Sequence, residues 1–213
     1  MSSMLEVKNI QVAYGKIIAV KDVSVKVDKG EIVTLIGSNG AGKSTTLRTI
    51  SGLIKPKSGE ILFNGQRIDG VPGHDIVAMG ICHSPEGRRI FPRMTVKENL
   101  ELGAFLRNDK AAVNADMERV LDLFPRLKER IKQTAGMNAQ ESQIFIEFIN
   151  KLVAERDIAV MLIEHDMKVV MSLSQRITVL DQGEKIAEGS PDEIKNNPRV
   201  IEAYLGKPKA ARK

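Results

Sequence analysis

Tryptophan is absent from this 213-residue sequence, and aromatic residues of all kinds make up only 4% of it. Aromatic platforms on which nucleic-acid bases stack are therefore not expected. A single cysteine, Cys82, excludes an internal disulfide framework and fits a reducing compartment. No apolar run approaches the ~18 residues of a membrane-spanning helix, and the start MSSMLEVKNI lacks the features of a secretory signal peptide. These absences predict a soluble, intracellular protein.

The net charge of +5 is unevenly distributed. Four basic residues, Lys207, Lys209, Arg212 and Lys213, lie in the last seven positions, so the body of the chain is nearly balanced. We expect this tail to be a solvated terminus, and we predict no nucleic-acid partner.

Hydrophobic periodicity predicts strands that alternate with helices, as in parallel βαβ units. Apolar residues alternate with polar ones over 5–27, with a turn at Tyr14-Gly15, and EIVTLI (31–36) is typical of a strand buried on both faces. The further predicted elements are a helix over 44–53, a hairpin around Asn64-Gly65, a short strand at 81–83, helices over 95–130 broken at Pro125, a helix opened by Asn138 and Glu141, a buried strand at 158–163 followed by a short helix, and a strand pair around Gln182-Gly183.

The segment GSNGAGKS, Gly37 to Ser44, matches the pattern G-x-x-x-x-G-K-[ST] of a phosphate-binding loop (P-loop). The predicted buried strand before it and the helix after it are the context that this motif requires. Glycines let backbone N–H groups turn toward phosphate oxygens, and the helix N-terminus adds a positive dipole end. A chance glycine-rich turn does not account for the Lys-Ser pair. The predicted nucleotide-binding residues here are Gly37, Ser38, Asn39, Gly40, Ala41, Gly42, Lys43, Ser44 and Thr45.

Two residues of this loop carry specific chemistry. Lys43 supplies a point charge to the outer phosphates, and the Ser44 hydroxyl is a ligand for Mg²⁺.

The residues around the loop resemble the ATP-binding subunits of ABC transporters, and specifically the pair that serves branched-chain amino acid uptake. The matching segments are VAYGKIIAV, LRTISGLIKPKSGEILFNG, SPEGRRIFPRMTVKENL, LIEHDMKVVMSLSQRITVLDQGEKIAEGSPDEI and NPRVIEAYLG. The resemblance implies an α/β P-loop NTPase fold of the ABC ATP-binding type, with a parallel core sheet, helices and an N-terminal antiparallel β layer. The cofactors that it implies are ATP and Mg²⁺.

The resemblance also assigns roles to three residues outside the loop. Tyr14 matches the aromatic residue that stacks on adenine, although a turn tyrosine can also simply pack on the β layer. Glu86 stands where most ABC ATPases carry Gln, and its implied role is to contact Mg²⁺ and the attacking water and to sense the membrane subunit. An exposed loop carboxylate is the alternative. His165 follows a predicted strand and is implied to hydrogen-bond the γ-phosphate, with a purely structural role as the alternative. The implied catalytic residues are thus His165, Glu86 and Lys43.

Two elements of the family pattern are missing. No Gly-Gly pair occurs in the chain, so the LSGGQ-like signature loop is absent. The only Asp-Glu pair is Asp192-Glu193, which follows Pro191 rather than an apolar strand, so no Walker B element is recognised. Residues 1–136 resemble one subunit of the pair and 137–213 its partner, which predicts an internal deletion or a fusion near 136–137 of a single ABC ATP-binding domain spanning 1–213.

These features predict the ATP-binding subunit of a branched-chain amino acid importer, which energises import by ATP binding and hydrolysis, in an internally shortened form. The alternative is a degenerate module that holds ATP with little or no hydrolysis. A small-molecule kinase lacks support because no Arg-rich lid is recognised. The implied partners are a second ATP-binding subunit in a homo- or heterodimer, two transmembrane permease subunits and, indirectly, a solute-binding protein. The implied location is cytoplasmic, on the inner face of the cell membrane.

Overall fold

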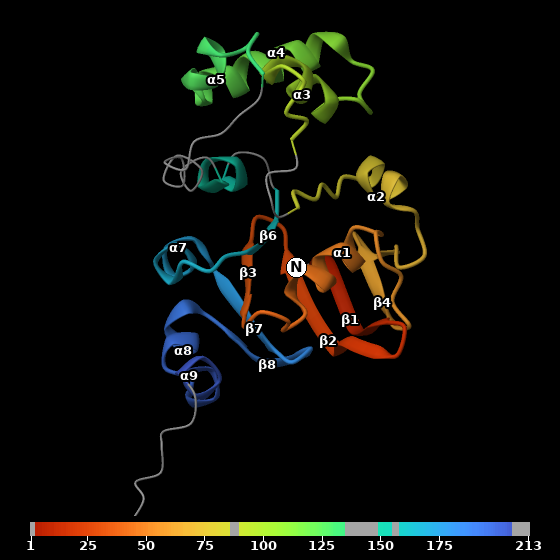
Figure 1. The fold of residues 1–213 in the computed structure, drawn as a ribbon, viewed down its shortest axis with the longest axis vertical. Coiled ribbons are helices and arrows are strands. Elements are labelled where there is room, and N and C mark those ends of the chain that lie inside the picture. Colours follow the sequence, from red (N-terminus) through yellow and green to blue (C-terminus); the bar gives the residue numbers. More distant parts are fainter. Residues whose placement is uncertain (1–2, 86–89, 135–148, 155–157, 206–213) are drawn as a thin grey trace, which may run out of the picture. The chain divides into compact units, whose positions relative to one another are not determined.

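The computed structural model describes residues 3–85, 90–134, 149–154 and 158–205, with side chains up to residue 203 (Figure 1). Its elements are, in chain order, β1 (Ser3–Tyr14), β2 (Ile17–Asp28), β3 (Ile32–Gly37), α1 (Lys43–Ile50), β4 (Ser58–Phe63), β5 (Gln66–Arg67), α2 (Gly73–Met79), α3 (Val96–Gly103), α4 (Lys110–Leu123), α5 (Pro125–Glu129), β6 (Val160–Ile163), α7 (Met167–Leu173), β7 (Arg176–Asp181), β8 (Glu184–Gly189), α8 (Pro191–Lys195) and α9 (Pro198–Leu205). Residues 149–154 are also helical.

The elements form two compact units, which are described separately. The first, from residues 1–82 and 149–213, contains every strand among the described residues, and the second spans residues 83–148. Among the described helices, none has both the length and the hydrophobicity needed to cross a membrane.

The N-terminal strands form an antiparallel sheet in the order β2-β1-β4-β5, which confirms the predicted antiparallel layer. The alternating pattern over 5–27 is confirmed, since Val23, Val25 and Val27 are buried and the residues between them are not. The predicted hairpin at Asn64-Gly65 also forms, with φ values of 49° and 79° that suit a type I′ turn. Local sequence is sufficient here because each side chain's face follows from its register.

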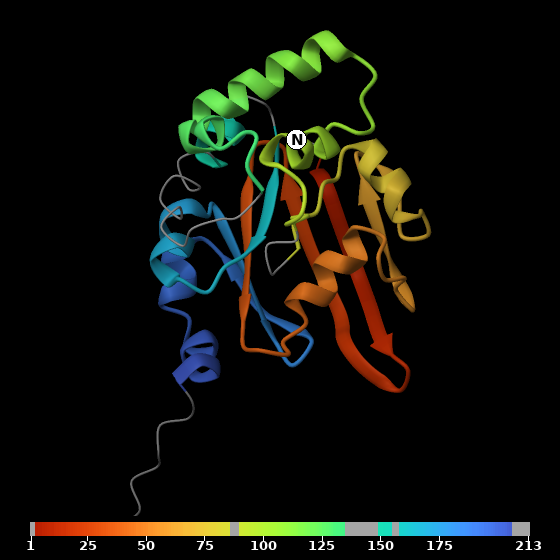
Figure 2. The same cartoon turned by 45° about the horizontal axis from the view of Figure 1, so that its top comes forward.

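The second sheet has the order β6-β3-β7-β8, in which β3 pairs in parallel with both β6 and β7. Every residue of β3 is buried, as the sequence predicts for a strand covered on both faces. The pair β7 and β8 is antiparallel around Gln182-Gly183, which is also confirmed. Helix α1 contacts β1, β2 and β3 and so lies against both sheets (Figure 2). This packing places the residues between β3 and α1 next to the β1–β2 layer.

Three predicted elements differ from the structure. Residues 81–83 are not a strand, since a strand needs a hydrogen-bonded neighbour and none of the described residues pairs with them. Strand β6 is confirmed in position, but it is half-buried rather than buried and pairs only with β3 among the described residues. Helix α1 ends at Ile50, not at residue 53, because Gly52 adopts a φ of 70° and the next N–H, of Leu53, donates to the Arg48 carbonyl at 2.9 Å.

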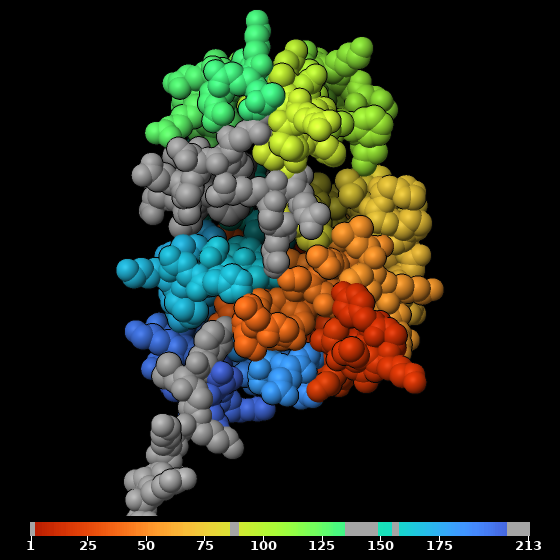
Figure 3. Space-filling model, in the orientation of Figure 1, coloured from red at the N-terminus to blue at the C-terminus, as the bar shows by residue number. Residues whose placement is uncertain are grey.

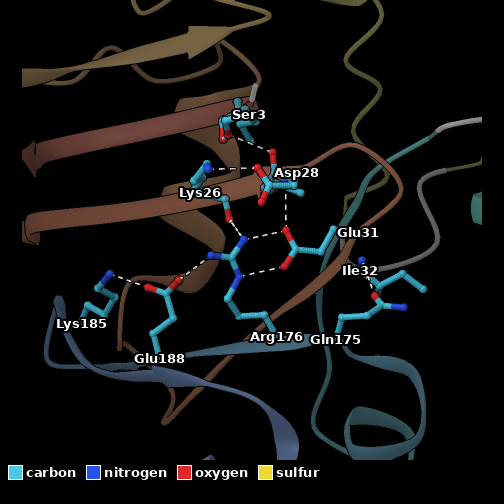
Figure 4. A network of polar contacts seen from close by, with 11 residues as sticks. Ser3, Lys26, Asp28, Glu31, Ile32, Gln175, Arg176, Lys185 and Glu188 are labelled. Carbon is cyan, nitrogen blue, oxygen red and sulfur yellow. Dashed lines mark hydrogen bonds and ion pairs between the residues drawn. The ribbon is translucent and has the colours of Figure 1, made fainter. Parts of the chain in front are cut away.

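A charged cluster joins the two sheets at the start of β7 (Figure 4). The Arg176 guanidinium donates to both carboxylate oxygens of Glu31, at 2.6 and 2.8 Å, to Glu188 at 3.1 Å and to the Lys26 carbonyl at 2.8 Å. Partial burial opposes the charge of Arg176, but the hydrogen bonds and charge of Glu31 outweigh it and raise the pKa of the guanidinium. Because Lys26 lies on β2 and Glu188 on β8, one side chain holds both layers together.

The second unit is helical, as predicted for 95–130. Thr95 and Glu98 form a reciprocal capping box that starts α3, and Pro125 occupies the first turn of α5, where the break was predicted. The start of the helix predicted from Asn138 and Glu141 lies outside the described residues. Residues 149–154, which belong to the first unit, are helical.

The position of β6 leads to a prediction on local stability. Hydrogen exchange is expected to show weaker protection of the amides at 158–163 than at 31–36. Strand β3 is buried and paired on both sides, whereas β6 is half-buried with one described partner strand. Exchange measured by mass spectrometry on the full chain checks this, and equally strong protection in both segments would show that the sheet closes fully beyond β6.

Candidate nucleotide-binding site

The loop between β3 and α1 is packed tightly against neighbouring backbone, which explains its glycines. Gly37 has a φ of 153°, and a Cβ there would lie 2.1 Å from the carbonyl oxygen of Leu180 on β7. Gly42 has a φ of 100°, and its Cβ would lie 2.9 Å from the Ala19 carbonyl oxygen on β2. Both positions therefore require glycine, and together they form a narrow loop between the two sheets.

Lys43 is the first residue of α1 and is only 6% exposed. Its ammonium group donates to the carbonyl oxygens of Gly37, at 2.8 Å, and Ser38, at 2.9 Å, so the charge lies inside the loop. Helix α1 has no side-chain cap and no acidic residue in its first turn. A buried cation beside an uncapped helix N-terminus fits an anionic phosphate group.

The structure brings Tyr14 to the same loop. The Tyr14 hydroxyl lies 3.4 Å from the Thr45 hydroxyl, although 31 residues separate the two in sequence. The Tyr14 side chain is 48% exposed, so part of its ring is open to solvent. A ring beside a phosphate-binding loop can stack on a flat ligand.

His165 lies at the carboxyl end of β6. Since Ile163 pairs with Leu35 in a parallel register, this end meets the same edge of the sheet as the start of the P-loop at Gly37. His165 is exposed. The neighbouring Glu164 carboxylate accepts the backbone N–H groups of His165, at 2.8 Å, and Asp166, at 3.0 Å, and therefore organises this turn.

Two further sequence predictions have different outcomes. Glu86 lies outside the described residues. The pair Asp192-Glu193 is confirmed in a loop-to-helix setting, because it forms the first turn of α8 and the Glu193 carboxylate accepts the Ser190 N–H at 2.7 Å. That carboxylate therefore serves as a helix cap. Among the described residues, no three His, Cys, Asp or Glu side chains are grouped as metal ligands.

Sequence reasoning missed two residues that contact the loop. Gly183 donates its N–H to the Ala41 carbonyl at 3.1 Å, and Asp181 accepts the Ser38 hydroxyl at 3.4 Å. The dipeptide Gln182-Gly183 indicated a hairpin turn and nothing more. Only the parallel pairing of β3 and β7 brings this turn beside the P-loop.

A buried central strand, a glycine-rich loop and an uncapped helix carrying a buried lysine define a P-loop nucleotide-binding protein of the α/β class. The sequence model of the ABC transporter family matches residues 20–185, and that of the branched-chain amino acid ATP-binding cassette transporters matches residues 184–210. The chain therefore belongs to the ABC transporter family.

Named relatives of the chain are ATP-binding proteins of branched-chain amino acid transport. The chain is 39% identical to the high-affinity branched-chain amino acid transport ATP-binding protein BraG of Pseudomonas aeruginosa, over 95% of this chain and 100% of BraG. It is 32% identical to the high-affinity branched-chain amino acid transport ATP-binding protein LivG of Escherichia coli, over 95% of this chain and 98% of LivG.

Solved structures share the fold. A nucleotide-free ATP-binding cassette from an ABC transporter superposes with a TM-score of 0.82 at 23% identity, covering 97% of this chain and all of that one. The ADP conformation of MJ1267, an ATP-binding cassette of an ABC transporter, superposes with a TM-score of 0.81 at 22% identity, with the same coverage. These likenesses confirm the predicted ABC ATP-binding fold.

Proposed function

We propose that this protein is the ATP-binding subunit of an importer for branched-chain amino acids. The observation that carries the proposal is the 39% identity to BraG across 95% of the chain, in a molecule whose phosphate-binding loop is complete. The segment matched by the branched-chain family model, 184–210, adds support because it lies outside the P-loop region. The proposal treats residues 1–213 as one ABC ATP-binding domain.

The residues of the site fit Mg-ATP. Lys43 would hold the outer phosphates, the Ser44 hydroxyl would ligate Mg²⁺, and Tyr14 would stack on the adenine. In an occupied site His165 would hydrogen-bond the γ-phosphate, and Glu86 would contact the metal and the water. The buried ammonium of Lys43 and the uncapped N-terminus of α1 support this assignment, since both favour bound negative charge.

When bound, ATP supplies the free energy released by phosphoryl transfer. To catalyse this reaction the family uses, besides the P-loop, a Walker B Asp and a group that orients water. This sequence has no Asp-Glu pair after an apolar strand and no Gly-Gly pair. The alignment with BraG runs over 233 positions, whereas this chain has 213 residues, so at least 20 positions of BraG have no counterpart here. We infer that they include the signature loop and Walker B strand, lost near 136–137.

The proposed partners are two permease subunits and a second ATP-binding subunit, at the inner face of the cell membrane. The helical unit offers an apolar surface that supports such a contact. Leu102, Phe105 and Leu106, at and just after the end of α3, are 41%, 79% and 52% exposed. Large apolar side chains grouped on a surface favour an interaction with another protein.

An uptake assay tests the proposal. The protein is coexpressed with the permease subunits and solute-binding protein of its own transport system, in cells that lack their own branched-chain amino acid uptake. Accumulation of labelled leucine, dependent on Lys43 and slower than with an intact ATP-binding subunit in the same place, is the expected result. Absence of uptake with all subunits present in the membrane fraction would contradict the proposal. Steady-state phosphate release by the purified protein then separates a turning-over ATPase from a module that only holds ATP.

A further inference from the structure

The turn between β7 and β8 touches the P-loop through its backbone. The Gly183 N–H donates to the carbonyl oxygen of Ala41 at 3.1 Å, and the Gly183 carbonyl accepts the N–H of Lys21, on β2, at 2.6 Å. One glycine thus links the P-loop to the antiparallel sheet. Figure 3 shows orange atoms lying beside red atoms of the N-terminal segment and blue atoms of the C-terminal segment on this face.

The start of the P-loop is held by the same segment. Gly37 pairs with Leu180 in the parallel register of β3 and β7. One residue further along the sequence from each of these two, the Ser38 hydroxyl donates to the Asp181 carboxylate at 3.4 Å. Residues 180–183 therefore contact the loop at both its first residues and its middle.

The contact leaves no room for a side chain at Gly183. Its φ is +84°, and a Cβ would lie 2.8 Å from the Ala19 carbonyl oxygen and 3.4 Å from the Val20 Cα. A Cβ on Gly42, in the P-loop itself, would meet the same Ala19 oxygen at 2.9 Å and the Gly183 Cα at 3.6 Å. The backbones of β2, the P-loop and the β7–β8 turn therefore pack directly on one another.

This packing sets the direction in which the loop's N–H groups point. In a planar trans peptide the carbonyl oxygen and the following N–H point in opposite directions. Because Gly183 fixes the Ala41 carbonyl toward the β7–β8 turn, the Gly42 N–H points away from that turn.

We propose that Asp181 and Gly183 are positioning residues for phosphate binding. Gly183 holds the Ala41 carbonyl toward the β7–β8 turn so that the Gly42 N–H faces the phosphates, and Asp181 holds the Ser38 side chain at the start of the loop. The inference rests on the proposed nucleotide site. It assigns to the β7–β8 turn a role in ligand affinity that is separate from its role in closing a hairpin.

The main test replaces Gly183 with alanine and compares the binding of ATP and of inorganic tripolyphosphate by calorimetry. A misdirected N–H loses a hydrogen bond to a charged group, so Gly183→Ala is expected to weaken both ligands by about tenfold or more. Equal losses are expected because tripolyphosphate has no base or sugar and depends on the loop alone. Tyr14→Ala, by contrast, is expected to weaken ATP more than tripolyphosphate, which has no base to stack on the ring.

Gly65→Ala is the matched control. Gly65 has a φ of +79°, close to that of Gly183, but a Cβ there meets nothing within 4 Å. The two substitutions thus impose similar backbone strain, but only at Gly183 would the Cβ collide with the β2 backbone at Ala19 and displace the turn that contacts the P-loop. Both are expected to lower the melting temperature, whereas tripolyphosphate affinity of the folded protein is expected to fall only in Gly183→Ala.

A second pair of variants covers the case in which Gly183→Ala does not fold. Asp181→Asn and Asp181→Ala are both neutral, but only asparagine keeps an oxygen that can accept the Ser38 hydroxyl. Tripolyphosphate is expected to bind the alanine variant about threefold more weakly than the asparagine variant, as for loss of one neutral hydrogen bond.

Each outcome bears on a different statement. If the wild-type protein binds tripolyphosphate and both Gly183→Ala and the Asp181 pair bind it equally well, the positioning role is wrong and the nucleotide site stands. If the wild-type protein binds neither tripolyphosphate nor ATP, the proposed function fails and the positioning role fails with it.

Discussion

Replacing Lys43 with alanine is expected to weaken ATP binding by about 10- to 100-fold, the effect of losing a hydrogen bond to a charged group. The Lys43 ammonium lies inside the P-loop, 2.8 and 2.9 Å from two of its carbonyl oxygens, where the outer phosphates are proposed to bind. Because the residue is only 6% exposed, solvent screens this charge weakly. Isothermal titration calorimetry with Mg-ATP measures the change directly.

Lys55→Ala is the control for this substitution. Lys55 is exposed and follows α1 in the chain, so its removal changes the net charge by the same amount without touching the loop. We expect ATP to bind this variant as tightly as it binds the wild type. Equal affinity of the wild type and of Lys43→Ala would rule out phosphate binding at this loop.

Steady-state ATP hydrolysis by the isolated protein is expected to be slower than that of an intact relative such as BraG by at least about 10²- to 10³-fold, the cost of one lost electrostatic group. Phosphoryl transfer depends on positioning and charge stabilisation, and the family divides these between the P-loop, a Walker B Asp and a group that orients water. This chain has the P-loop residues and His165, but no Asp-Glu pair ends an apolar strand. Phosphate release under saturating Mg-ATP, measured side by side with BraG, gives the ratio.

Two carboxylates are candidates for partial rescue, and each has a matched amide variant. Glu86→Gln tests the residue that the resemblance places near the metal. Glu164→Gln tests a carboxylate that already accepts two backbone N–H groups at the end of β6, and we expect this substitution to change turnover little. Turnover equal to that of BraG, abolished by Lys43→Ala, would show that another carboxylate has taken the Walker B role and that our interpretation of the gap is wrong.

Local sequence determined much of this molecule. Alternating apolar residues predicted β1 and β2, since side chains on a strand point alternately to its two faces. The P-loop was predicted because its function requires particular residue types at fixed spacing, whatever surrounds them. Asn64-Gly65 predicted its hairpin because both residues tolerate the positive φ of a type I′ turn.

Tertiary structure decided the rest. Residues 81–83 have the composition of a strand, yet they form none in the described structure, because a strand exists only where a neighbour offers hydrogen bonds. The end of α1 depended on the positive φ of Gly52. Strand β6 is half-buried, with β3 as its one described partner strand. The clearest case is Gly183, for which the sequence predicted only a hairpin turn. The pairing of β7 with β3 is what brings its N–H to the P-loop. Contacts between residues more than 140 positions apart leave no periodic trace in the sequence, so the support of the loop could be seen only in the fold.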